Sequence, residues 1–180
     1  MNMNMSFVLI LSFLLVACSG KQNQLEKINN LEESLYGNST TEFNKAKALQ
    51  LVDMYFEFAE ANQEDTNSRV FLFKAGEVAM GMMESNKAIE CFHLLYTKYP
   101  EHKKASTSLF LEGFVYETQM KDLAMAQKIY LEFLQKYPDH SLANDAKFSL
   151  QNLGKSDEEI IKEFEQKIQE EANQNTTNPI

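Results

Sequence analysis

The chain has 180 residues, of which 44% are hydrophobic and 24% charged, and this globular balance excludes a wholly disordered or fibrous protein. Its 17 basic and 26 acidic residues give a net charge of −9, and no cluster of Lys and Arg is present to contact phosphates, so binding to nucleic acid is not expected. The 6 Gly and 3 Pro residues supply few of the tight turns of an all-β domain, and 2 Cys residues cannot form a disulfide framework.

The N-terminal segment carries one apolar run, Phe7 to Ala17. As a helix this run would reach only about 16 Å, roughly half the thickness of a bilayer core, which is typical of the apolar region of a signal peptide. At its end, Leu15-Val16-Ala17-Cys18 resembles the lipobox of bacterial lipoproteins, in which cleavage precedes the Cys and its thiol is acylated. The resemblance implies a signal peptide over residues 1–17 and a membrane anchor at Cys18. The alternative is a plain secretory signal that ends by chance in a Cys.

Residues 18–24 are polar after the Cys and lack apolar periodicity, so we expect them to form a short tether. Ser19 stands directly after the Cys, where some bacteria place an Asp as an inner-membrane retention signal. The absence of an Asp at this position favours the outer membrane, and we expect the lipoprotein to face the periplasm.

Three helices are expected next along the chain. Apolar residues from Leu25 to Leu35 suggest a first helix that ends before Gly37, and residues 42–61 have the apolar spacing of a second. Asp65 then opens a third helix that runs to Met83.

An internal repeat dominates the middle of the chain. The segment at 98–102, Lys-Tyr-Pro-Glu-His, recurs as Lys-Tyr-Pro-Asp-His at 136–140, with an offset of 138 − 100 = 38 residues. At the same offset Ala88 and Phe92 match Ala126 and Tyr130, and upstream of each Ala lies another amphipathic stretch that carries a Gly, Gly76 in one unit and Gly113 in the other. The pattern of each unit therefore predicts two helices that cross closely at small residues, the second of which ends at a Pro.

This arrangement resembles the tetratricopeptide repeat, a pair of antiparallel helices in about 34 residues. Gly76, Ala88, Phe92 and Pro100 fall at the family's Gly, Ala, Phe and Pro positions, and the second unit matches if one residue is added in the turn near Lys121. The resemblance implies an all-α fold, a right-handed TPR-like α-solenoid of antiparallel helix pairs, which we place at residues 25–171.

A weaker third pair is expected at 143–153 and 157–168. Gly154 suits the position after a helix, and Ser156 with Glu159 resembles a capping box. The polar end of the chain, residues 172–180, is expected to be disordered.

No pattern of catalytic, metal-binding or cofactor-binding residues is found, and we expect no enzyme. His102 and His140 occupy equivalent places after each Pro and are interpreted as repeated caps rather than metal ligands. Cys91 is interpreted as a buried structural thiol, and His93 as a helix residue with no carboxylates near it. The acidic residues between Asp157 and Glu171 are interpreted as a solvated face.

The first helix of each unit carries apolar residues on more than one face. In tetratricopeptide repeats these helices line a concave groove, and the resemblance implies a partner-binding groove at Phe73, Glu77, Met80, Phe110, Phe114, Glu117 and Phe148. The alternative is that these aromatic side chains are core between repeats.

The repeats, which cover residues 42–165, and the lipobox at residues 15–18 are together similar to two periplasmic groups. These are the BamD-like lipoproteins of the outer-membrane β-barrel assembly machinery and the repeat domain of the Tol-Pal-associated protein CpoB (YbgF). The resemblance implies a lipid-anchored periplasmic scaffold that binds envelope proteins during outer-membrane protein assembly or envelope maintenance. The alternative is a ligand-binding lipoprotein that serves peptidoglycan or glycan metabolism, and a hydrolase is a third, weaker possibility.

Overall fold

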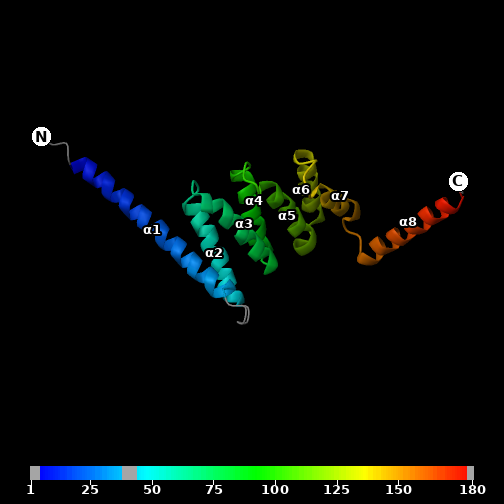
Figure 1. Ribbon diagram of the computed structural model, residues 1–180, viewed down its shortest axis with the longest axis horizontal. Helices are drawn as coiled ribbons and strands as arrows, with labels where there is room; N and C mark the ends of the chain where they lie inside the picture. The colour runs from blue at the N-terminus through cyan, green and yellow to red at the C-terminus, as the bar shows by residue number, and fades with distance from the viewer. Residues whose placement is uncertain (1–4, 38–43, 178–180) are drawn as a thin grey trace.

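The computed structural model describes residues 5–37 and 44–177, with side chains described over 20–37 and 44–170. No strand occurs within these ranges, which form eight α-helices and one π-helix, η1 (Figure 1). The elements are α1 (Met5–Tyr36), α2 (Lys45–Ala61), α3 (Thr66–Gly81), α4 (Ser85–Lys98), α5 (Ala105–Val115), η1 (Tyr116–Met120), α6 (Leu123–Lys136), α7 (Ala143–Asn152) and α8 (Asp157–Thr177).

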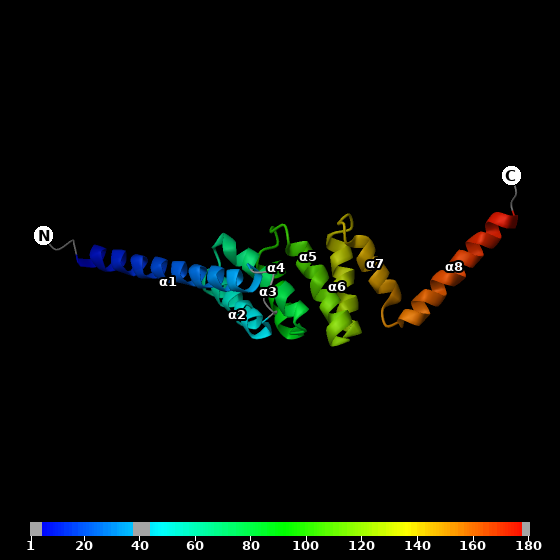
Figure 2. The same ribbon diagram turned by 60° about the horizontal axis from the view of Figure 1, so that its bottom comes forward.

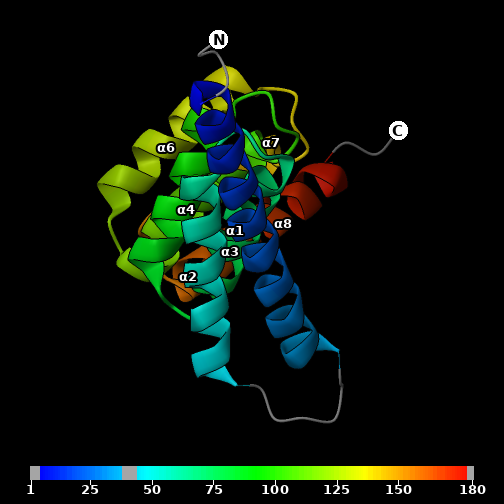
Figure 3. The same ribbon diagram turned by 90° about the vertical axis from the view of Figure 1, so that its left-hand side faces the viewer.

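The helices from α2 to α7 stack side by side in chain order, and α1 and α8 project from the two ends of the stack (Figures 1 and 2). Viewed along the stack, α2, α4 and α6 lie on one side, whereas α1, α3 and α7 lie on the other (Figure 3). This alternation is the TPR-like α-solenoid of antiparallel pairs expected from the sequence.

Within each unit the two helices meet where a Gly faces an aromatic ring. A Cβ added to Gly76 would lie 2.5 Å from Cε1 of Phe92, and one added to Gly113 would lie 3.0 Å from Cε1 of Tyr130. Both rings are fully buried. The spacing of Gly and aromatic residue therefore identifies the crossing correctly, because only a residue without a side chain leaves room for the ring.

The two units also end their second helices alike. The N–H of Tyr99 donates to the carbonyl of Leu95 at 3.0 Å, and the N–H of Tyr137 donates to that of Phe133 at 2.8 Å. After each Pro, the histidine Nδ1 accepts a backbone N–H two residues ahead, at 3.4 Å for His102 and 3.1 Å for His140. The interpretation of the two histidines as repeated caps is confirmed.

The extra residue of the second unit is accommodated in η1. The carbonyl of Tyr116 accepts the N–H of Lys121, and also that of Asp122 at 2.9 Å, so the helix widens beyond the ordinary four-residue bond. Lys121 then takes a left-handed conformation with φ of 56°. We expected the added residue in the turn near Lys121, and the structure places the adjustment in the helical turn just before it.

Capping residues set most of the other helix starts. Asn44, Asp65 and Asp122 each accept a backbone N–H from the first turn of the following helix. The capping box is confirmed, because the N–H of Ser156 donates to Glu159 at 2.8 Å and the N–H of Glu159 donates to the Ser156 hydroxyl at 3.3 Å. Gly154 has a φ of 83°, as its place after α7 predicts. Helix α2 starts at Lys45; the expected start at residue 42 lies outside the described residues.

Two boundaries differ from the expected ones. Residues 18–24 are helical and continuous with the rest of α1, so they do not form a separate tether. Lys21 pairs with Asp65 at 3.0 Å, and Gln24 accepts a hydrogen bond from Asn62 at 3.4 Å, so this turn is held against the loop between α2 and α3. At the other end, α8 continues to Thr177 because no Gly or Pro interrupts residues 155–178, so most of the expected disordered tail is helical.

The buried side chains form two clusters. One joins α1 to α4 around Tyr55, Phe58 and Phe92 and also includes Val115 of α5. The other joins α5, α6 and α7 around Tyr130 and Phe133 and also includes Tyr96 of α4. Leu111 of α5 packs against both clusters.

Candidate functional site

The expected groove residues fall into two groups. Phe73 and Phe110 are buried, and their rings pack 6.1 Å from Phe92 and 5.5 Å from Tyr130, centre to centre. These ring contacts join the two helices of one pair, so both residues belong to the core within a repeat. Only 9% of Phe110 is exposed, whereas 37% of Phe114, one turn later on α5, is exposed.

The remaining groove residues of α3, α5 and η1 lie at or near the surface. Glu77 is exposed as a residue, but its carboxyl is partly shielded from water, which raises its pKa. The positive charge of Lys104 lowers the pKa by a smaller amount. Met80 is half-buried. Glu117 is also half-buried and accepts a hydrogen bond of 2.7 Å from the Tyr130 hydroxyl, so it stabilises the helix pair as well as facing solvent.

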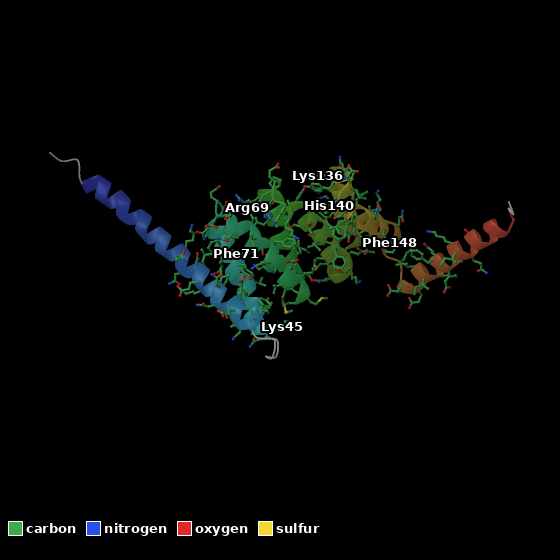
Figure 4. All side chains as sticks on the ribbon, viewed as in Figure 1. Lys45, Arg69, Phe71, Lys136, His140 and Phe148 are labelled. Carbon is green, nitrogen blue, oxygen red and sulfur yellow. The ribbon has the colours of Figure 1, made fainter. Side chains whose placement is uncertain are left out.

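Exposed apolar side chains gather at the C-terminal end. Phe148 of α7 is exposed, on the side of the stack toward α8 (Figure 4), and its ring centre lies 6.4 Å from that of Phe164. Ile161, Phe164 and Ile168, which we call the α8 stripe, are each more than half exposed and follow helical spacing on one face. Large apolar groups gathered in this way mark interaction surfaces more often than isolated ones.

A second feature lies on the other side of α5, in the space between α4 and α6. Glu112 is buried, with 3% of its surface exposed, and its two carboxylate oxygens lie 3.2 and 3.3 Å from Nδ1 of His93. Burial raises the pKa of the Glu112 carboxyl, although His93 opposes the shift. The expectation that no carboxylate lies near His93 is therefore wrong.

A hydrogen-bonded triad borders the same space. The Tyr96 hydroxyl donates to Glu132 at 2.7 Å, and Nζ of Lys136 lies 2.9 Å from the same carboxylate oxygen and also contacts the Tyr96 hydroxyl. Lys136 lies on α6 near His140 (Figure 4). These contacts lower the pKa of Glu132, first through Tyr96 and then through Lys136.

Sequence reasoning did not find the contact between Glu112 and His93. A position-by-position comparison of the units marks Glu112 as a charged residue at an apolar position, but it does not identify His93 as its partner. With the offset of 113 − 76 = 37 residues between the first helices, Glu112 matches the buried Ala75, and one unit later, at 112 + 38 = 150, it matches the partly buried Leu150.

Other singled-out residues have simpler roles. Cys91 is buried, and burial raises the pKa of its thiol to about 12, as expected for a structural residue. In the described part of the chain, no group of three or more His, Cys, Asp or Glu residues could hold a metal ion. Cys18 lies in α1, but its side chain is outside the described ones. Of the helices described, none has the length and apolar character needed to cross a bilayer.

Comparison with known proteins bears on the repeat alone. The tetratricopeptide repeat family matches residues 107–140, a segment that covers most of α5, all of η1 and α6, and the loop that ends at His140. The chain therefore contains a tetratricopeptide repeat, a module that commonly mediates contacts between proteins. No curated protein and no solved structure matches the chain significantly.

Proposed function

We propose that this protein is a lipid-anchored, non-enzymatic scaffold on the periplasmic side of the outer membrane, and that it binds a segment of another envelope protein. The observation that carries the binding role is the set of exposed apolar side chains in the C-terminal half of a tetratricopeptide-repeat solenoid. Phe114 on α5, Phe148 on α7 and the α8 stripe form this set. We call it the C-terminal docking surface.

Aromatic side chains on rigid helices suit such a surface, because they offer large contact areas at a small cost in conformational entropy. The buried partners Phe110 and Tyr130 hold α5 against α6, so Phe114 is presented from a helix that is already ordered. Assembly of outer-membrane proteins or maintenance of the envelope are the roles that the resemblance of the repeats and lipobox supports.

The anchor is proposed at Cys18, on the resemblance of residues 15–18 to a lipobox. Among the described side chains of α1, which begin at residue 20, the first fully buried one is Ile28, 28 − 18 = 10 residues after the Cys. At about 1.5 Å per residue this separation is roughly 15 Å. The scaffold would then stand close to the membrane surface, within reach of lipid-embedded partners.

The binding role is tested by crosslinking in intact membranes, followed by purification of the full-length protein. We expect envelope proteins to co-purify with the wild type and to be lost from the double variant Phe148→Ala/Phe164→Ala. The matched control is Leu131→Ala, because Leu131 is an exposed apolar residue of α6 outside the C-terminal docking surface. Equal recovery with both variants, or recovery of a glycan alone, would contradict the proposal.

The anchor is tested separately by fractionation. Cys18→Ala should release the protein from membranes or leave it uncleaved, and it should abolish labelling with radioactive palmitate. Labelling that persists in the variant would refute the lipobox interpretation without bearing on the docking surface.

A further inference from the structure

The carboxylate of Glu112 is not required by the repeat frame. The equivalent positions of the neighbouring units carry the apolar residues Ala75 and Leu150, and burying an ionised carboxylate costs several kcal/mol unless it is paired. A packed apolar side chain would serve the fold at least as well. The presence of the Glu112 carboxylate in this one unit therefore indicates a role besides packing.

Within the protein, Glu112 is paired on one side only. Its two oxygens can accept about four hydrogen bonds, and the described residues supply one donor, Nδ1 of His93. The side chain of His93 is 58% exposed, so this donor is itself in contact with water. A buried carboxylate with so few donors has unused capacity to bind a cation.

The unused capacity faces a cavity of about 520 Å³ between α4, α5 and α6, which we call the Glu112 pocket. Glu112 and Glu132 both line it. Burial raises the pKa of Glu112, and the charge of Glu132 adds to that effect. Tyr96 and Tyr137 add aromatic surface, and Leu109 adds apolar surface.

The chemistry of these walls selects the ligand. Lys136 is paired with Glu132 and balances its charge, whereas the buried Glu112 meets the solvent-exposed ring of His93, so this second carboxylate disfavours an anion. A planar guanidinium suits the pocket better than an ammonium ion, because its forked donors match carboxylates and its flat, weakly hydrated face stacks on aromatic rings.

We propose that the Glu112 pocket binds the guanidinium group of an arginine side chain in a partner polypeptide, with Glu112 and Glu132 as its acceptors. The inference does not depend on the C-terminal docking surface, because the Glu112 pocket shares no residue with it. It adds a second, charge-selective contact on the opposite side of α5.

The test uses capped arginine, Nα-acetyl-arginine amide, titrated into the full-length protein in detergent micelles, with binding followed by calorimetry and by the His93 ring resonances. We expect saturable binding with one site per chain. Capped citrulline, the neutral analogue of the same shape, should not bind, and capped lysine should bind at least about fivefold more weakly. Free arginine should also bind more weakly than capped arginine, because its own carboxylate is repelled, which distinguishes a peptide side chain from the free amino acid.

Glu112→Gln should weaken binding of capped arginine by about tenfold or more, because it removes the charge and keeps the shape. The matched control is Glu101→Gln, at an exposed carboxylate outside the pocket, which should bind as the wild type does. If Glu112→Gln does not fold, Glu132→Gln provides the same comparison, because Glu132 is less buried and lies on the other wall. Binding that is unchanged in the glutamine variant, or equal binding of citrulline and arginine, would overturn the proposal.

Discussion

The helix pairs α3–α4 and α5–α6 have the same frame but differ in what they place between units. In both, a Gly faces an aromatic ring, a buried Ala precedes that ring by four residues, and the second helix ends at Tyr-Pro. The first pair places the small side chain of Ala75 against its neighbours, and the second pair places Glu112 there. Contacts within a pair therefore constrain the sequence tightly, whereas a contact between pairs can acquire a charge without loss of the fold.

The two pairs also turn differently between their helices. Helix α3 ends regularly and is capped by a bond of 2.9 Å from the Glu84 N–H to the Ala79 carbonyl, with Met83 left-handed at φ of 62°. Helix α5 passes through η1 before Lys121 takes the equivalent conformation. The π-helix thus absorbs an added residue and leaves the next helix in its place.

The largest expected change in stability comes from truncating a side chain on the buried face of α5, and the exposed face provides the comparison. Phe110→Ala should lower the free energy of unfolding by about 3–5 kcal/mol, because it empties a space packed against Tyr130 and Phe133. Phe114→Ala should change it by no more than about 0.5 kcal/mol, because much of this ring is in solvent. Chemical denaturation of the two single variants measures both values. Similar losses would show that Phe114 is core and would remove it from the C-terminal docking surface.

The second prediction compares the two glycines. In Gly76→Ala the new Cβ would lie 2.5 Å from the Phe92 ring, so the ring or the helices must shift, at a cost of about 1–3 kcal/mol. In Gly113→Ala the contact is 3.0 Å, and the better helix propensity of Ala, worth about 1 kcal/mol, should nearly offset it. Urea denaturation should therefore rank Gly76→Ala as clearly less stable. Equal effects would show that the two crossings are equally tight.

The third prediction concerns pH and uses the difference between Ala75 and Glu112. Glu112 faces His93 of α4 and Glu132 and Lys128 of α6, and its pKa is raised by burial. Its folded form therefore holds a proton more tightly than the unfolded chain does, so its contribution to stability is full below the ordinary Glu pKa of about 4.3 and is lost as pH rises through the raised value. Glu112→Gln should remove this loss and stabilise the protein at neutral pH, on the order of 1 kcal/mol.

Melting curves of wild type and Glu112→Gln, recorded from below the ordinary Glu pKa up to neutral pH, provide the measurement. Glu101→Gln is the control for an exposed carboxylate. If the wild type became more stable relative to Glu112→Gln as pH rises, the assigned direction of the Glu112 pKa shift would be wrong.

The smallest expected effect is at the two turns. Met83→Gly and Lys121→Gly should each stabilise the protein by up to about 1 kcal/mol, because Gly adopts the left-handed conformation without steric cost. Met82→Gly is the matched control: its φ of −87° suits an ordinary residue, so Gly there should destabilise by about 0.5–1 kcal/mol. Thermal melting of the three variants checks the signs, and stabilisation by Met82→Gly would show that the gain has another origin.

The helix pairs could be predicted from sequence because their contacts join residues at fixed spacing, such as Gly76 with Phe92 and Gly113 with Tyr130. The capping box at Ser156 is readable for the same reason. The start of α1 and the end of α8 could not be predicted from the sequence, because polar composition does not distinguish an exposed helix from an extended tether.

The candidate sites were less readable. The resemblance to the repeat family placed Phe73 and Phe110 with Phe114, but burial depends on how neighbouring pairs tilt, which motif spacing does not specify. Glu112 and His93 lie 19 residues apart on different helices, and each is an ordinary residue in its own segment. Only their packing reveals the pair.

The division of the core into two clusters also sets how the molecule opens. In a solenoid each pair contacts only its neighbours, so local openings can occur without global unfolding. Amide hydrogens of α3 and α4, which are flanked on both sides, should exchange with solvent slowest, and those of α7 and α8 fastest. A polypeptide bound at the C-terminal docking surface would slow exchange in α7 and α8 while leaving α3 and α4 unchanged, so occupancy of this end could be followed in time without any label on the partner.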